Sequence, residues 1–219
     1  MLAGLLRHLH RLAHAGAHLV SVITARRRRK KADHGAPVRM IDTAGVDELR
    51  TRRVVLRRWR AEDEPAMVRI NRDPEVGRYL NRPVDEKSVA VFFGQIVEHW
   101  DSHGFGPWAL ESLEPGVAGR FLGFAGLAYA PPFLAAAGSA PELGWRLDRS
   151  AWGRGLATEA AIAARDDAFG RLRLPEIISI IHPENEASQR VAVKLGMQRH
   201  CRIENPVIGI EVDVWRLEN

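Results

Sequence analysis

The chain has 219 residues, of which 46% are hydrophobic and 27% charged, as in an ordinary soluble globular protein that can bury a sizeable core. Its formal net charge of +5 is unevenly distributed, because residues 1–39 carry nine lysines and arginines against Asp33 alone, which gives +8 there and −3 for the rest. The acidic remainder argues against a nucleic-acid-binding body, and the single cysteine, Cys201, excludes an intrachain disulfide.

The first 39 residues form a separate basic segment. Leucines recur at roughly helical spacing, and the basic run Arg26–Lys31 follows them. No apolar run is long enough to cross a bilayer, and the positive charge follows the apolar stretch, whereas a secretory signal has it in front. We interpret residues 1–39 as a tail, disordered or partly helical, or as sequence upstream of a start at Met40. A membrane-surface helix and an RNA-binding arm are the alternatives.

Residues 40–219 form one domain of strands and helices. β-branched and apolar runs predict the strands, while apolar residues at helical spacing, ended by proline or glycine, predict the helices. The expected strands are 52–59, 108–112, 121–129, 142–147, 175–182, 198–204 and 208–217, and the expected helices are 63–73, 89–100, 155–170 and 186–195. The order β-α-α-β-β-β-α-β-α-β-β predicts an α/β fold in which helices cover the faces of a mixed sheet.

The connection between the strand at 142–147 and the helix at 155–170 has a distinctive composition. It reads Trp152-Gly153-Arg154-Gly155-Leu156-Ala157-Thr158. Two glycines one residue apart let the backbone approach a ligand with no Cβ in the way. The helix that begins there presents unpaired N–H groups and a partial positive charge. The pattern indicates a phosphate or pyrophosphate site, with a plain strand-to-helix turn as the alternative.

Four stretches, in this order, resemble motifs of a known family. They are Arg72–Val76 with Tyr79-Leu80, Gly123–Leu127, Glu142–Leu147 with the glycine turn, and Asn185–Ser188 with Lys194–Met197. Together they resemble the RimJ/RimL-like branch of the GNAT superfamily of N-acetyltransferases, which includes ribosomal-protein N-terminal acetyltransferases. The resemblance runs from roughly Thr51 to the C-terminus, and Trp152 stands where the wider superfamily has Gln or Arg.

The resemblance implies a fold and a cofactor site. The fold would be a GNAT-like mixed, mostly antiparallel sheet of about seven strands flanked by about four helices. Acetyl-CoA would bind as a substrate, with its pyrophosphate on the amides of the glycine turn and its pantetheine arm beside the preceding strand and Asn185. The implied binding residues are Trp145, Arg146, Leu147, Gly153, Arg154, Gly155, Leu156, Ala157, Thr158 and Asn185. Arg154 is equally compatible with a solvated loop residue, and Asn185 with a helix N-cap.

Acetyl transfer to an amine requires a neutral nucleophile, although an alkylamine with a pKa of about 10.4 is almost fully protonated at pH 7. Glu142, on the strand that should face the acyl group, is the first candidate to accept the proton, and Glu111 is the second. A surface carboxylate at a strand start is the alternative for Glu142. Ser188 resembles the serine that this branch places near the thioester sulfur, and otherwise is a polar residue of a first helical turn.

The sequence thus predicts an acetyl-CoA-dependent N-acetyltransferase acting on a primary amine, either a protein N-terminus or a small amine, by direct transfer in a ternary complex. A non-catalytic acyl-CoA-binding regulatory domain and a ribosome- or RNA-associated factor using the basic tail are the alternatives. We expect a cytoplasmic monomer or homodimer without a membrane span, with nucleic acid contacted only through the tail. No metal is expected, because the histidines of the body lack the spacing of a zinc site.

Overall fold

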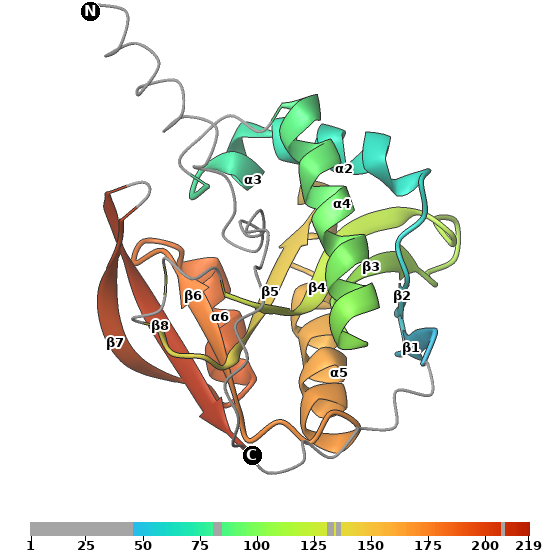
Figure 1. The fold of residues 1–219 in the computed structure, drawn as a ribbon. Coiled ribbons are helices and arrows are strands. Elements are labelled where there is room, and N and C mark those ends of the chain that lie inside the picture. The colour runs from blue at the N-terminus through green and yellow to red at the C-terminus, as the bar shows by residue number, and fades with distance from the viewer. Residues whose placement is uncertain (1–45, 81–84, 131–133, 135–136, 207–208) are drawn as a thin grey trace, which may run out of the picture.

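A computed structural model describes residues 46–80, 85–130, 134, 137–206 and 209–219 (Figure 1). The predicted tail and the start at Met40 lie outside these residues. The strands described are β1 (Glu48–Arg50), β2 (Val54–Arg57), β3 (Pro107–Ser112), β4 (Phe121–Tyr129), β5 (Pro141–Leu147), β6 (Glu176–Ile181), β7 (Gln198–Asn205) and β8 (Ile210–Glu218). The helices are α2 (Asp63–Arg72), α3 (Pro74–Gly77), α4 (Glu86–His103), α5 (Leu156–Gly170) and α6 (Glu186–Lys194), with a 3-10 turn, η2 (Arg149–Ala151).

The predicted elements are confirmed, and three short ones were missed. β1, α3 and η2 have three or four residues each, too few to leave a periodic pattern in the sequence. The helix predicted at 89–100 is longer than expected. Asp85 caps its N-terminus by accepting a hydrogen bond from the Ser88 N–H, and Gly104 ends it in the left-handed conformation, φ 70°.

The strands form one mixed sheet in the order β1-β2-β3-β4-β5-β6-β8-β7. Every neighbouring pair is antiparallel except β5 and β6, which are parallel. That parallel pairing has a single register match, Glu142 with Ile178, whereas the antiparallel pairing of β4 with β5 runs from Gly123–Leu147 to Tyr129–Pro141. The sheet therefore separates between β5 and β6, near its middle. The predicted mixed, mostly antiparallel α/β fold is confirmed.

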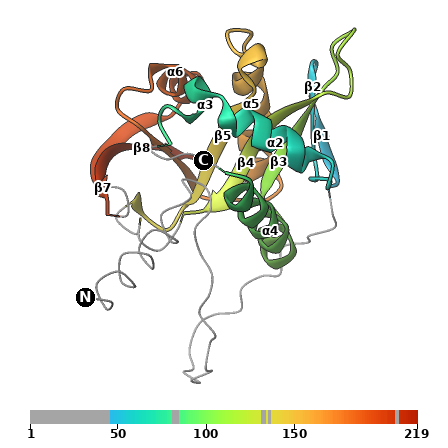
Figure 2. The ribbon, with the colours of Figure 1, turned by 90° about the horizontal axis from the view of Figure 1, so that it is seen from above.

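Helices cover both faces of the sheet. Figures 1 and 2 show α4 and α5 on opposite sides of the central strands. Met67 and Ile70 of α2 and Val89 of α4 pack against Phe124 in one buried cluster. The alanines of α5 pack against apolar residues of β3 to β6 in the larger cluster, and their small side chains let this helix approach the sheet closely. β4 is buried on both faces, as its unbroken apolar run predicts.

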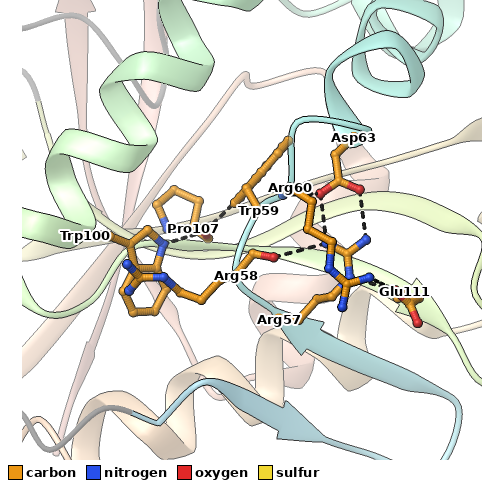
Figure 3. Close-up of polar contacts among 8 residues, drawn as sticks. All are labelled: Arg57, Arg58, Trp59, Arg60, Asp63, Trp100, Pro107 and Glu111. Carbon is orange, nitrogen blue, oxygen red and sulfur yellow. Dashed lines mark hydrogen bonds and ion pairs between the residues drawn. The ribbon is translucent and has the colours of Figure 1, made fainter.

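A buried ion-pair network joins the end of β2 to the start of α2 (Figure 3). Arg57 donates to both carboxylate oxygens of Asp63, at 2.8 and 2.8 Å, and to Glu111 at 2.6 Å. Hydrogen bonding to Asp63 is the main reason that the pKa of Arg57 is raised. The indole N–H groups of Trp59 and Trp100 both donate to the Pro107 carbonyl, each at 3.0 Å. These contacts fix α2 and α4 against β3.

Candidate active site

The separation of β5 from β6 opens a cleft of about 860 Å³. The Ser179 hydroxyl donates to the Leu143 carbonyl at 2.6 Å and ties the two strands together next to the point where they part. Beyond it, the cleft is bounded by the end of β5, the first turn of α5, the end of β6 and one face of α6. Strand edges that face a cleft keep backbone N–H and C=O groups available to an extended ligand.

The glycine turn forms one end of this cleft, and its conformation requires glycine. Gly153 and Gly155 have φ of 71° and 76°, in the left-handed region that other residues avoid. A Cβ on Gly153 would meet no atom within 4 Å, so the requirement there is conformational rather than steric. Gly155 is the N-cap of α5 without a side-chain cap, so the N–H groups of the first helical turn lack a partner in the helix. This geometry suits an anion.

All but one of the predicted binding residues line the cleft. Those that do are Trp145, Arg146, Leu147, Gly153, Gly155, Leu156, Ala157, Thr158 and Asn185. The side chain of Arg154 instead forms an ion pair with Glu114 at 2.6 Å, outside the residues that line the cleft. Trp152 also lines the cleft; its indole N–H donates to the carbonyl of Leu147, the last residue of β5, at 2.9 Å, although the residue is 43% exposed.

The first turn of α6 forms the opposite wall. The Asn185 side chain accepts a hydrogen bond from the Ser188 N–H at 3.1 Å, which confirms the N-cap interpretation. Ser188 is half-buried and lines the cleft, as do Ala187, Val191 and Lys194 on the same face of the helix. The two residues predicted from the second motif therefore lie across the cleft from the glycine turn.

Glu142 lies where β5 and β6 part, and it is buried. It is 3% exposed, and its Oε2 has no hydrogen-bond partner in the part of the chain that the structure describes. Burial raises the pKa of Glu142 to about 8, against which a hydrogen bond from the Ile180 backbone acts. The alternative of a surface carboxylate is therefore wrong. The second candidate, Glu111, is held by Arg57 and does not line the cleft.

Glu142 faces the side of the sheet that α2 covers. Glu142, Gly144 and Arg146 alternate along β5 and share a face. Arg146 donates to Asn71 of α2 at 2.9 Å, and its guanidinium lies 5.5 Å from the centre of the Phe124 ring. Glu142 therefore lies on the α2 side of the sheet, whereas the glycine turn lies at the N-terminus of α5.

The cleft is also lined by two residues that the sequence reasoning did not select, Tyr79 and His182. Their ring centres lie 5.0 Å apart, and the Tyr79 hydroxyl donates to the Glu184 carbonyl at 3.0 Å. The Glu184 N–H donates to Nδ1 of His182 at 3.1 Å, so the neutral ring carries its hydrogen on Nε2. Tyr79 belongs to a motif quoted above and His182 ends the strand predicted at 175–182, but nothing in the sequence indicates that they meet across the cleft.

Comparison with known proteins identifies the family. The sequence profile of the acetyltransferase (GNAT) domain matches residues 53–198. The chain belongs to the GNAT acetyltransferase family. This GNAT protein is similar to the uncharacterized N-acetyltransferase p20 of Bacillus licheniformis, with 28% identity over 165 residues that cover 70% of this chain and 84% of p20.

Solved structures agree with this assignment. An acetyltransferase from Agrobacterium tumefaciens superposes with a TM-score of 0.67 and 28% identity, covering 87% of this chain and 99% of that one. RimJ of Mycobacterium smegmatis, solved in complex with CoA-disulfide, has a TM-score of 0.57 and 20% identity over 75% of this chain and 81% of its own, and shows a shared fold. The GNAT chain is thus an acyltransferase, and its domain is one that uses acetyl-CoA.

The described residues contain no group of three or more His, Cys, Asp or Glu side chains placed to hold a metal ion. None of their helices combines the length and the apolar character that crossing a membrane requires.

Proposed function

We propose that this GNAT acetyltransferase transfers the acetyl group of acetyl-CoA to a primary amine by direct attack in a ternary complex, with the ionised form of Glu142 as the proton acceptor. One observation carries the proposal: a buried carboxylate lies at the vertex of the cleft, and one of its oxygens has no hydrogen-bond partner among the described residues. Burial of an unpaired carboxyl group is costly, and such groups concentrate at functional sites. A non-catalytic CoA-binding domain has no need of this group.

The pKa of Glu142 favours a particular kind of acceptor. A carboxyl group with a pKa of about 8 exchanges a proton almost evenly with an α-amine, whose pKa is about 8. Proton transfer to Glu142 from a lysine-like ammonium, with a pKa of about 10.4, is unfavourable by roughly two pKa units. We therefore favour a protein N-terminus, or a small amine of similarly low pKa, as the acceptor. The shared fold of RimJ is compatible with this choice.

The remaining cleft residues supply binding and charge stabilisation in this proposal. Backbone N–H groups from Gly153 to Thr158 hold the diphosphate of CoA, and the free edge of β5 at Trp145–Leu147 holds the pantetheine arm. The ammonium proton of the acceptor passes to Glu142, the neutral nitrogen then forms its bond to the thioester carbonyl carbon, and the C–S bond breaks as the departing thiolate takes up the remaining ammonium proton. A backbone N–H of β5 stabilises the oxyanion, and the Ser188 hydroxyl donates to the departing thiolate.

The test uses the purified full-length chain, with residues 40–219 alone in parallel, because we propose those residues as the catalytic domain and residues 1–39 as an appendage. Release of the CoA thiol is followed with peptides that have free N-termini and with small amines as acceptors. We expect acceptor-dependent release, reduced about 10²- to 10⁴-fold by Glu142→Gln while the Kd of CoA stays the same. Unchanged turnover in Glu142→Gln would refute the role of Glu142. Binding of CoA without acetylation of any acceptor would favour the binding domain.

A further inference from the structure

Arg53 contacts the glycine turn from outside the cleft. It precedes β2 and is absent from the cleft lining, yet its Nη1 donates to the Arg154 carbonyl at 2.8 Å. Its Nη2 lies 3.6 Å from the position that a Cβ on Gly155 would occupy. The guanidinium thus packs directly against the turn whose amides face the cleft.

Arg53 is itself held by the first turn of α5. Its Nε donates to Oε2 of Glu159 at 2.7 Å, while Oε1 of Glu159 accepts from the Arg53 N–H at 2.8 Å and from the Thr51 hydroxyl at 2.7 Å. Burial acts to raise the pKa of Glu159, but the hydrogen bonds from Thr51 and Arg53 outweigh it and lower that pKa. One ionised carboxylate therefore joins the segment before β2 to the helix that follows the turn.

We propose that Arg53 is a positioning residue for the diphosphate-binding turn, acting through the Arg154 carbonyl and Glu159. The inference rests on the proposed binding of CoA at this turn. Gly153 and Gly155 give the turn more backbone freedom than any other residue would, and ordering glycine on binding costs conformational entropy. Arg53 orders the turn before the ligand arrives, because its two hydrogen bonds fix the carbonyl before Gly155 and the helix after it. Preorganisation of this kind increases affinity without a new ligand contact.

The geometry sets the expected effect of substitution. A guanidinium reaches two acceptors at once from Nε and Nη1, whereas the single ammonium of lysine has no such fork. Arg53→Lys should therefore restore only part of what Arg53→Met removes. The matched control is Arg50→Met, three residues earlier, which removes the same charge from a side chain that is 59% exposed and paired only with Glu48 among the described ion pairs.

The experiment compares two acyl donors, acetyl-CoA and S-acetyl-pantetheine, which lacks the diphosphate. With Arg53→Met we expect the Kd of CoA and the KM of acetyl-CoA to rise about tenfold, with kcat within about twofold and kcat/KM for S-acetyl-pantetheine unchanged. The Kd and KM of Arg53→Lys should lie between those of Arg53→Met and the wild type, and those of Arg50→Met should match the wild type. Glu159→Gln should reproduce the selective rise in KM, and it carries the test if Arg53→Met fails to fold.

Two results would overturn the inference. One is an unchanged Kd of CoA in both Arg53→Met and Glu159→Gln. The other is an equal loss with both donors, because that pattern means a general structural role rather than positioning of the diphosphate turn. A wild-type chain that does not bind CoA would instead refute the proposed function, so the two failures are distinguishable.

Discussion

Glu142→Gln should make the stability of this protein less dependent on pH. The pKa of Glu142 is about 8 in the folded chain against an ordinary 4.5. Between these two values the folded state keeps a proton that the unfolded state has lost. Unfolding therefore releases a proton, and the free energy of unfolding falls as the pH rises through this window. The contribution of the neutral carboxyl is complete below pH 4.5 and has been lost above about pH 8.

The size of the effect on the free energy of unfolding follows from the difference between the folded and unfolded pKa values of Glu142. At about 1.4 kcal/mol for each pH unit, the window from 4.5 to about 8 corresponds to about 5 kcal/mol. Glutamine keeps the shape but does not titrate. Its amide N–H₂ stands where Oε2 has no partner among the residues that the structure describes, so the variant also carries a cost of about 1–3 kcal/mol that does not depend on pH. The informative quantity is therefore how the difference in the free energy of unfolding between variant and wild type changes with pH, and not its value at one pH.

Urea unfolding followed by tryptophan fluorescence at pH 5, 6, 7 and 8 measures this slope. The free energy of unfolding of Glu142→Gln, relative to that of the wild type, should rise by about 1.4 kcal/mol for each pH unit. Glu48→Gln, which changes an exposed carboxylate on β1, is the matched control. A difference between Glu142→Gln and the wild type that is the same at every pH would mean that Glu142 titrates normally in the folded protein. The argument for its role as base would then fail.

Three further predictions concern the cleft and its supports. Gly155→Ala forces alanine to φ 76°, so it should cost about 1–2 kcal/mol of stability and weaken CoA binding measured by calorimetry; unchanged binding would contradict the anion site. Ser188→Ala should lower kcat about tenfold with the Kd of CoA unchanged, because one hydrogen bond to the thiolate is lost; an unaffected kcat would remove Ser188 from the mechanism. Asp63→Asn should destabilise the fold by about 3 kcal/mol in urea unfolding, since it leaves a buried Arg57 partly uncompensated; a loss below 1 kcal/mol would show that Glu111 suffices.

Features that depend on neighbouring residues could be predicted from the sequence. The apolar run 121–129 marked a strand, and the glycine at 170 marked the end of α5. Gly153 and Gly155 indicated a strand-to-helix turn, where the structure has φ of 71° and 76°, and Asn185 indicated a helix N-cap. These properties are local, because steric limits on φ and hydrogen bonds to the next turn involve only a few consecutive residues.

Features that depend on distant residues were decided by the tertiary structure. Glu142 reads as a strand-start carboxylate in the sequence, and only the packing around it removes it from water and raises its pKa. Arg154, predicted as a binding residue, forms an ion pair with Glu114 of the connection between β3 and β4.

The contacts of Arg53 with Glu159 and of Tyr79 with His182 join segments about a hundred residues apart. The residue types and their local spacing indicated the candidate anion site and the candidate proton acceptor. Burial and long-range pairing, which exist only once the strands have separated and the helices have packed, decided which side chains are free to do it.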